Sequence, residues 1–548
     1  MKRNLIYSFV IVIVGIVLFS SCSPMPKHAQ YIPSDAAFVS VIDIVSIAQK
    51  GKLQDAKSLK MYSQAIEFFN STNQNTGILL ESLVTEPKKT GIDIFSDLFV
   101  YSVIQNEKVY MCVSVKLDNK ENFQNLMEGI LGDEFDLQEQ DAFTYYTNES
   151  NTWIAFNDKN AVFISSGQAK SDEALELIQR IFTQSKDESI AESKEFIEFY
   201  KQKKDVSIWI SSTHIIEGMS NETKKAIEKN LESFQGLSIN DILNNYIHLF
   251  LNFEEDDITL DFNLQANDAF KTFLDKTDFT KDKLSEEVLS FLPQTSYFLM
   301  SYAFESDKLV QYLQSLPDFK QLDDEIQNQG VSLKEFISAL NGDIVLSVFN
   351  ASLDVVQKNK TLLRQDSKGR YQYVDTVIYD EQIIPKAAMV LSLKDEEYMK
   401  KFIAEKIPAE LYTKQDSYLD FTKTLNFPLY LGIHNNMLML STDIGAMSQL
   451  YDGGYPESLS TSDLVQEIDA AAFYYVNLDF ETYPIQVKEF VNKSFLQHIL
   501  KPYLNTFESL TISSNGLYSG RLQIKLKNSK ENSLYQVLEM LDGNFKQQ

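Results

Sequence analysis

The cysteine at position 22 is the residue whose type and neighbours indicate a chemical modification most clearly. Cys22 follows Leu18-Phe19-Ser20-Ser21, and small residues directly before a cysteine fit the narrow site of a signal peptidase. This is the pattern of a lipobox, in which the cysteine sulfur is joined to diacylglycerol. It departs from the common pattern at Phe19, where leucine is usual, because Leu18 lies one position too early. We expect Cys22 to carry a thioether-linked diacylglycerol and an N-acyl chain such as palmitate.

The residues before this cysteine have the composition of an export signal. Lys2 and Arg3 give a positive start, and residues 5–19 form an almost unbroken apolar run of about 15 residues. A membrane-spanning helix needs about 20. We predict a signal peptide at residues 1–21 and a lipidated tether at residues 22–30. The alternatives, an uncleaved anchor and an ordinary secretory signal, also export the chain.

The predicted lipid defines a first partner, the bilayer. More than one hydrocarbon chain on Cys22 is enough for stable anchoring, so the protein should fractionate with membranes. Ser23, rather than aspartate, next to the cysteine resembles lipoproteins that are released to the outer membrane. The chain also lacks an acidic run just after the cysteine. We therefore predict an outer-membrane lipoprotein and favour the periplasmic face over the cell surface.

The other residues that could act in catalysis or bind metal lack the spacing that such chemistry requires. A Gly-x-Ser-x-Gly motif, a phosphate-binding glycine loop and an EF-hand loop are absent from the sequence. The acidic run at residues 254–257 could bind Ca²⁺, although four acids at a hairpin tip are more typical of a solvated turn. We predict no catalytic residue, no metal site and no cofactor. The histidines form no zinc-ligand pair, and we interpret His248, in a strand, and His434, in a hairpin turn, as structural; the five are His28, His214, His248, His434 and His498.

The second cysteine, Cys112, lies in the apolar run at residues 109–115. Free cysteine behaves as a small hydrophobic residue, and a reactive thiolate needs basic or histidine neighbours, which this run lacks. We predict that Cys112 is a core residue. Because Cys22 is consumed by lipid, no disulfide can form within the chain.

Composition indicates a folded, strongly acidic protein. Of the 548 residues, 44% are hydrophobic and 12% aromatic, which is enough to bury the cores of two to four domains. The formal charge is −27, and removal of Lys2 and Arg3 with the signal takes away two positive charges and leaves −29. A body this acidic repels phosphate backbones, so nucleic-acid binding is disfavoured.

The mature chain repeats itself. Six pairs of segments recur in the same order at offsets of roughly 250 to 277 residues. We interpret this as a tandem duplication, with halves at residues 31–280 and 281–548. The alternative is that any two α+β stretches share strand alternation and turns. The pairs are 32–41 with 292–301, 91–94 with 342–345, 113–118 with 389–394, 154–165 with 431–441, 205–210 with 471–476, and 260–264 with 522–526.

Within each half, strands with alternating apolar residues come in hairpins, and an amphipathic helix follows each hairpin. Asp268, Phe270 and Phe273 begin one such helix, and residues 534–541 carry another apolar stripe. Turns as short as residues 254–257 force adjacent strands to be antiparallel. We predict an α+β fold of two similar halves, each an antiparallel or mixed sheet with helices on one face.

The second half contains an insertion. About 30 extra residues, at 351–385, extend a hairpin that turns within residues 105–108 in the first half. Residues 364–370 of the extension are basic, and the residues that follow are rich in tyrosine. Tyr and Arg carry much of the energy of protein interfaces. We hypothesise that it contacts a partner; the alternative is a longer hairpin packed on its own domain. The candidate contact residues are Arg364, Arg370, Tyr371, Tyr373 and Tyr379.

The segment after the cysteine resembles the start of a known protein family. Residues 31–43 read YIPSDAAFVSVID, close behind Cys22 and followed by Ser46 and Lys50. This opening resembles a family of large Gram-negative lipoproteins that is defined only as a domain of unknown function. The resemblance covers essentially the whole mature length and implies the localisation and one common fold. Because that family has no assigned activity, the resemblance implies no site residue.

Three functions are compatible with these observations. The first is a non-enzymatic envelope lipoprotein that binds or scaffolds other envelope proteins. The second is a glycan-acting hydrolase with paired carboxylates brought together from distant positions. The third is a small-ligand binding protein with its pocket between the two halves.

Overall fold

The computed structural model describes residues 25–53, 59–60, 62–64, 66–67, 81–82, 86–131, 135–148, 151–167, 171–233, 237–316, 319–328, 330–365, 369–468, 470–493 and 503–547. The predicted signal peptide and Cys22 lie outside these residues. The chain divides into two compact units, which we describe separately. Unit 1 consists of residues 1–271 and 529–548, and unit 2 of residues 272–528.

Unit 1 is built on a sheet in which the strands lie in the order β4-β5-β6-β7-β3-β2-β1-β8-β9-β10, with antiparallel neighbours throughout. The strands are β1 Phe38–Ile42, β2 Leu98–Gln105, β3 Lys108–Lys116, β4 Asp136–Glu139, β5 Thr144–Thr147, β6 Thr152–Phe156, β7 Asn160–Ser165, β8 Val206–Ser211, β9 Tyr246–Phe253 and β10 Asp257–Gln265. The helices are α2 Ile44–Lys50, α5 Lys120–Leu131, α6 Ser171–Thr183, α7 Lys194–Tyr200, α8 Ser212–Glu217, α9 Asn221–Ser233, α10 Asp268–Thr277, which crosses the boundary between the units, and α21 Ser533–Gln547.

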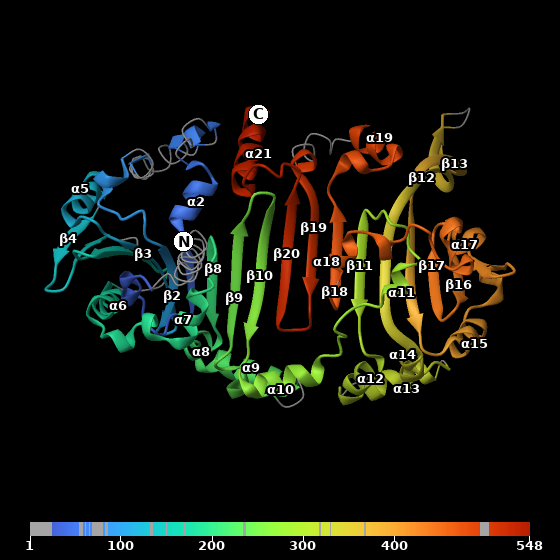
Figure 1. Cartoon of the computed structure of the whole chain (residues 1–548), viewed down its shortest axis with the longest axis horizontal. Helices are drawn as coiled ribbons and strands as arrows, with labels where there is room; N and C mark the ends of the chain where they lie inside the picture. The colour runs from blue at the N-terminus through green and yellow to red at the C-terminus, as the bar shows by residue number, and fades with distance from the viewer. Residues whose placement is uncertain are drawn as a thin grey trace, which may run out of the picture. The chain divides into compact units, whose positions relative to one another are not determined.

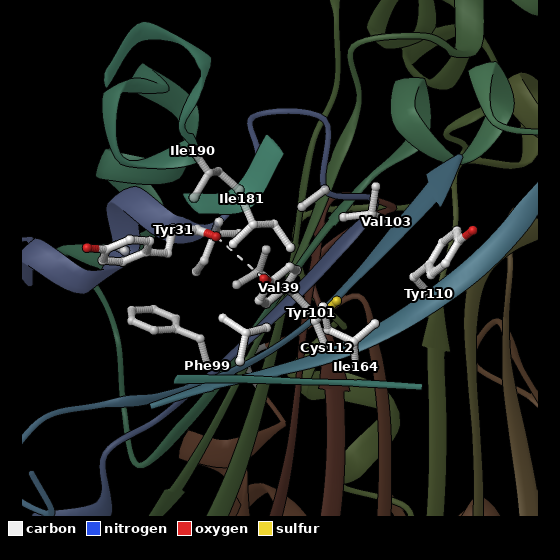
Figure 2. Packing of buried hydrophobic residues seen from close by; sticks show 14 of the residues in the cluster. Tyr31, Val39, Phe99, Tyr101, Val103, Tyr110, Cys112, Ile164, Ile181 and Ile190 are labelled. Carbon is white, nitrogen blue, oxygen red and sulfur yellow. Dashed lines mark hydrogen bonds between the residues drawn. The ribbon is translucent and has the colours of Figure 1, made fainter. Parts of the chain in front are cut away.

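Two hydrophobic cores lie on opposite faces of this sheet. On β3, Tyr110 and Cys112 belong to the core that α6 and α7 cover, whereas Val115 belongs to the core that α5 covers. Successive residues of a strand point to opposite faces, so these helices cover both faces. Figure 2 shows Cys112 between Tyr101 and Ile164 in the first core. The prediction that Cys112 is a core residue is confirmed, because its side chain is fully buried.

The expectation that helices lie on one face only is therefore wrong. A strand such as β3 is apolar at odd and even positions alike, so a single helical layer would leave one set of side chains in water. The broader prediction, a mixed α and β fold with antiparallel pairing, is confirmed.

Unit 2 repeats the strand order of unit 1. Its strands lie in the order β14-β15-β16-β17-β13-β12-β11-β18-β19-β20, again antiparallel throughout. The strands are β11 Phe298–Ala303, β12 Leu340–Gln365, β13 Tyr371–Leu393, β14 Thr413–Lys414, β15 Tyr418–Asp420, β16 Tyr430–His434, β17 Met437–Ser441, β18 Ala472–Asn477, β19 Phe507–Ser514 and β20 Ser519–Leu526. The helices are α11 Glu286–Leu289, α12 Ser306–Ser315, α13 Phe319–Gln327, α14 Leu333–Ser338, α15 Glu396–Lys406, α16 Thr422–Leu425, α17 Ile444–Asp452, α18 Leu464–Glu467 and α19 Ile485–Lys493.

The likeness extends to details at the start of each sheet. Pro33, before β1, forms an isolated antiparallel bridge with Ser189, before α7 and β8. Pro293, before β11, forms the same bridge with Ser458, before α18 and β18. Of the six segment pairs found in the sequence, five fall on strands at the same position in the two orders, and the sixth lies just before β2 in unit 1 and within β12 in unit 2.

Local turn chemistry explains the hairpins. Asn435 and Asn436 join β16 to β17 with φ of 50° and 59°, as a type I′ turn requires and asparagine tolerates. His434 is the last residue of β16, one position before that turn, and His248 lies in β9 as predicted. The acidic residues 254–256 form the exposed turn between β9 and β10.

The C-terminal helix α21 packs within unit 1. Lys52, after α2, pairs with Glu531 at 2.6 Å, and its ammonium lies 4.1 Å from the centroid of the Tyr535 ring. The Ser533 amide donates to the Glu254 carbonyl at 2.8 Å. Along the described part of the chain, we find no helix that is both long and apolar enough to cross a membrane.

Candidate binding surface

The candidate contact residues from the sequence lie on a hairpin arm of unit 2. We call residues 350–386 the arm. β11 pairs with β12 along residues 343–348, and β17 pairs with β13 along residues 388–392. Beyond these stretches, the pairings of the described residues join the two arm strands only to each other. Figure 1 shows β12 and β13 projecting past the ends of their neighbouring strands.

Three of the candidate residues share one face of the arm. Tyr371, Tyr373 and Tyr379 occupy odd-numbered positions of β13, so their side chains point to the same side of the strand. Leu363 on β12 lies directly opposite Tyr373. The three tyrosines are 68%, 79% and 72% exposed, and Leu363 and Val377 are also exposed. We call these five side chains the tyrosine face.

The two candidate arginines do not join this face. Arg364 lies opposite Gln372, so its side chain belongs to the other face of the ribbon. Arg370 directly precedes β13 and is exposed. The structure therefore brings the tyrosines together and places the arginines beside them.

A groove lies where the arm meets α19. It has a volume of about 1110 Å³, and its exposed apolar side chains include Leu353, Ile485 and Phe490. Leu353 lies opposite Ile383 on β13. Ile383, like the three tyrosines, is an odd-numbered residue of β13, so its side chain points to the same side of the arm. The groove therefore opens on the side of the arm that carries the tyrosines. We call it the arm groove. It is lined by Leu353, Glu381, Gln382, Ile383, Ile485, Gln486, Val487, Glu489, Phe490 and Val491.

The same side of the sheet carries two lateral rows of apolar side chains, which the sequence analysis missed. We call these rows the apolar face. No member of either row is charged, and none is fully buried. The first row runs, neighbour opposite neighbour, through Leu431, Leu440, Met389, Leu346, Met300, Tyr474, Ile512 and Leu522. The second runs through Ala387, Val348, Phe298, Val476, Leu510 and Ile524.

The apolar face and the tyrosine face are continuous along β13. The register shift between Val348 and Asn350 lies on β12, so the alternation of β13 runs without interruption from Met389 to Tyr371. Odd-numbered positions of β13 point to this side throughout. The signal that could have revealed the apolar face is the alternation of β19 and β20, whose other face carries Ser509, Thr511, Ser513, Arg521, Gln523 and Lys525.

A cluster of polar side chains around Lys203 in unit 1 has a structural role. Lys203 donates hydrogen bonds to Asp97 at 2.6 Å and to Asp43 at 2.9 Å, and Tyr200 donates to Asp97. Burial lowers the pKa of Lys203, but the hydrogen bonds and charges of Asp97 and Asp43 outweigh it and hold that pKa above the ordinary value. The cluster joins the end of α7 to the end of β1 and the start of β2, and all its charges are paired.

The opening segment of the chain also has a structural role. Ile32 is fully buried in the first core of unit 1, and Pro33 bridges to Ser189. Asp35 accepts a hydrogen bond from Arg180 on α6 at 2.8 Å. These contacts fasten the start of the folded chain to unit 1 and offer no reacting group.

Two further candidates are Cys112 as a nucleophile and the acidic and histidine side chains as metal ligands. Burial raises the pKa of the Cys112 thiol to about 12, so the thiol stays protonated at neutral pH. Among the residues that the structure describes, no group of three or more His, Cys, Asp or Glu side chains could hold a metal ion.

Comparison with known proteins identifies a family but no activity. A family model described as "Domain of unknown function (DUF4836)" matches residues 28–534, which confirms the resemblance to a family defined only in that way. No curated protein matches the chain. Three solved structures, crystal forms IV, III and I of TP0453, are 13%, 12% and 10% identical, with TM-scores of 0.25, 0.25 and 0.24. The matches cover 44%, 45% and 46% of this chain and 81%, 82% and 86% of those chains. TM-scores of this size do not establish a common fold.

Proposed function

We propose, from the premise that this chain belongs to the family described as "Domain of unknown function (DUF4836)", that it is a lipid-tethered envelope protein which acts by binding a protein partner through the arm. The tether is the lipid on Cys22, and the favoured location is the periplasmic face of the outer membrane. The contact surface is the tyrosine face together with the arm groove.

The exposure of the tyrosine face carries this proposal. Tyr371, Tyr373 and Tyr379 hold large rings in water on a two-stranded ribbon, and a lone hairpin is marginally stable without further packing. Tyrosine buries a large apolar area while its hydroxyl keeps a hydrogen bond, a combination that suits an interface of mixed polarity.

The charge of the outer part of the arm favours a protein partner with an acidic surface. Arg364, Arg370 and Lys360 are exposed on the outer part of the arm, residues 358–370, which contains five positive residues and one negative residue. The arm as a whole is nearly neutral, with six positive and five negative residues, whereas the chain has a formal charge of −27. Opposite charges across an interface speed association and fix its register. The basic outer part of the arm therefore contrasts with the acidic chain as a whole.

The matching strand orders of units 1 and 2 also support a tandem duplication. On this proposal the arm is an addition to the second copy, since β2 and β3 end at a short turn where β12 and β13 continue. Because unit 1 folds without such an extension, the arm is not needed for the shared fold and can have a separate function.

Site-specific photocrosslinking in membranes tests the partner. A photoreactive phenylalanine analogue would replace Tyr373 or Tyr379 in the full chain, with Gln372, the neighbour on the opposite face of β13, as the matched control. We expect one adduct of reproducible mass from both tyrosine positions and none from Gln372. The adduct from Tyr373 should disappear in the Tyr371→Ser, Tyr379→Ser variant. Equal labelling from Gln372, or no adduct from either tyrosine position, would overturn the proposal.

A further inference from the structure

We propose that the apolar face of unit 2 binds the hydrocarbon chains of a lipid molecule. This site adjoins the protein contact on the arm along β13 but shares no residue with it. It rests on the two lateral rows, which contain Leu, Ile, Met, Val, Phe, Ala and a single tyrosine, Tyr474.

The alternation of polar and apolar side chains along β19 and β20 indicates that a further apolar group should cover the apolar face. An antiparallel sheet with one face in water normally turns its polar residues to that face. On β19 and β20, the polar side chains, such as Thr511 and Gln523, occupy the opposite face, and Ile512 and Leu522 point to the apolar face. Ile512 and Tyr474 are each 40% exposed. Among the residues that the structure describes, Figure 1 shows no helix that crosses β19 or β20.

The part of this face that helices already cover lies at one end. Tyr302, Ile344 and Leu391, which have the same parity as the two rows, pack into the core beneath α12, α14 and α15. The first row lies two residues further along each of these strands, at Met300, Leu346 and Met389. No residue of either row belongs to the core beneath the helices. The uncovered rows are thus the continuation of a face that is buried where the protein supplies a cover.

The chemistry of the rows favours hydrocarbon over protein. A non-obligate protein interface is about as polar as the general surface, whereas these rows contain no charge and one hydroxyl. A second copy of the chain would bring two bodies of charge −27 together, which opposes association. A hydrocarbon chain has neither hydrogen-bonding groups nor charge, so it matches the rows.

The length of the first row also matches the length of acyl chains. It crosses eight strands, from Leu431 to Leu522, and strands lie about 4.8 Å apart, so the row is roughly 34 Å long. The hydrocarbon core of a bilayer, two acyl chains end to end, is about 30 Å thick. The row therefore accommodates extended acyl chains laid across the strands.

Photolabelling with a diazirine-bearing palmitate, dissolved below its micelle concentration, tests this site without a bilayer. The protein would be the full chain with Cys22→Ala, so that its own acyl groups do not compete. We expect adducts on peptides that contain Met300, Met389 or Ile512. Adducts that fall mainly elsewhere would overturn the proposal whether or not any variant folds.

Two variants on adjacent residues of β19 sharpen the test. Ile512→Glu places a charge in the row, and Ser513→Glu places the same charge on the opposite face. We expect labelling to fall at least tenfold in Ile512→Glu and to stay unchanged in Ser513→Glu, with equal circular dichroism spectra. Equal labelling of both variants would contradict the proposal.

The other occupants of this face give distinct results. Labelling that requires phosphatidylcholine vesicles would assign the face to the bilayer surface. A sedimentation mass of two chains that Ile512→Glu reduces to one, without palmitate adducts, would assign it to a second copy. Either result overturns binding of a single lipid molecule, and neither depends on the arm.

Discussion

The ammonium of Lys203 lies 2.6 Å from a carboxylate oxygen of Asp97, and both side chains are largely withdrawn from solvent, at 15% and 8% exposed. Asp43 takes a second hydrogen bond from the same ammonium at 2.9 Å. Removing the cation would leave two partly buried carboxylates without their partner, which costs more than the loss of a surface ion pair.

We therefore expect Lys203→Met to lower the free energy of unfolding by about 3–5 kcal/mol. Lys201→Met removes an exposed lysine two residues earlier and serves as the control, with an expected change within about 0.5 kcal/mol. Urea unfolding monitored by circular dichroism gives both values. Similar small changes in the two variants would show that the cluster contributes little to stability.

Gly342 occupies a position that only glycine can hold. Its φ is +93°, and a Cβ there would overlap the carbonyl oxygen of Phe304. Gly453 has the same φ of +93° with nothing within 4 Å of its Cβ position, so Gly453→Ala measures the backbone strain alone. We expect Gly453→Ala to cost about 1–2 kcal/mol and Gly342→Ala to cost clearly more, in thermal unfolding. Equal costs would mean that the Phe304 carbonyl moves aside freely.

His248 should give unit 1 a defined acid sensitivity. Burial lowers its pKa from 6.5 to about 4 in the folded chain. Because the unfolded chain binds the proton more readily, folding stability should fall as the pH drops from about 6.5 to about 4. His248→Gln removes the titrating group, so its stability profile should be flatter over that window than that of the unmodified chain. Parallel profiles in urea unfolding between these pH values would contradict this assignment.

Cys112 should be inert in the folded protein. Its side chain is fully buried, and burial raises the thiol pKa to about 12. Iodoacetamide at pH 8 should label it only after denaturation, since the thiolate is the reactive form. Rapid labelling of the native protein, measured by mass, would show that this core opens locally.

The features that could be predicted from sequence are those that local chemistry decides. The Asn435-Asn436 turn follows from the tolerance of asparagine for positive φ, and the burial of Cys112 follows from its apolar neighbours. The spacing of Tyr371 and Tyr373 by two residues also predicts a shared face on a strand.

The features that could not be predicted depend on pairing between distant strands. That Arg364 lies on the other face from the tyrosines depends on the register of β12 against β13, which no local pattern determines. The alternation of Ile512 and Leu510 shows one apolar side of β19, but not whether the protein itself covers that side. The apolar face therefore becomes visible only when the rows of neighbouring strands are aligned.

The proposed lipid tether on Cys22 can be tested independently of any binding. Lipid on that residue is the basis for expecting the protein in the membrane fraction, because a diacylglycerol and an N-acyl chain together anchor stably. Cys22→Ala should leave the fold intact and move the protein to the soluble envelope fraction, whereas Cys112→Ala, which keeps Cys22, should remain with the membrane. Thermal unfolding of both variants checks the fold. If the Cys22→Ala protein is exported, has lost residues 1–21 by mass and still sediments with membranes, then a protein partner or the apolar face, rather than lipid on Cys22, holds it there.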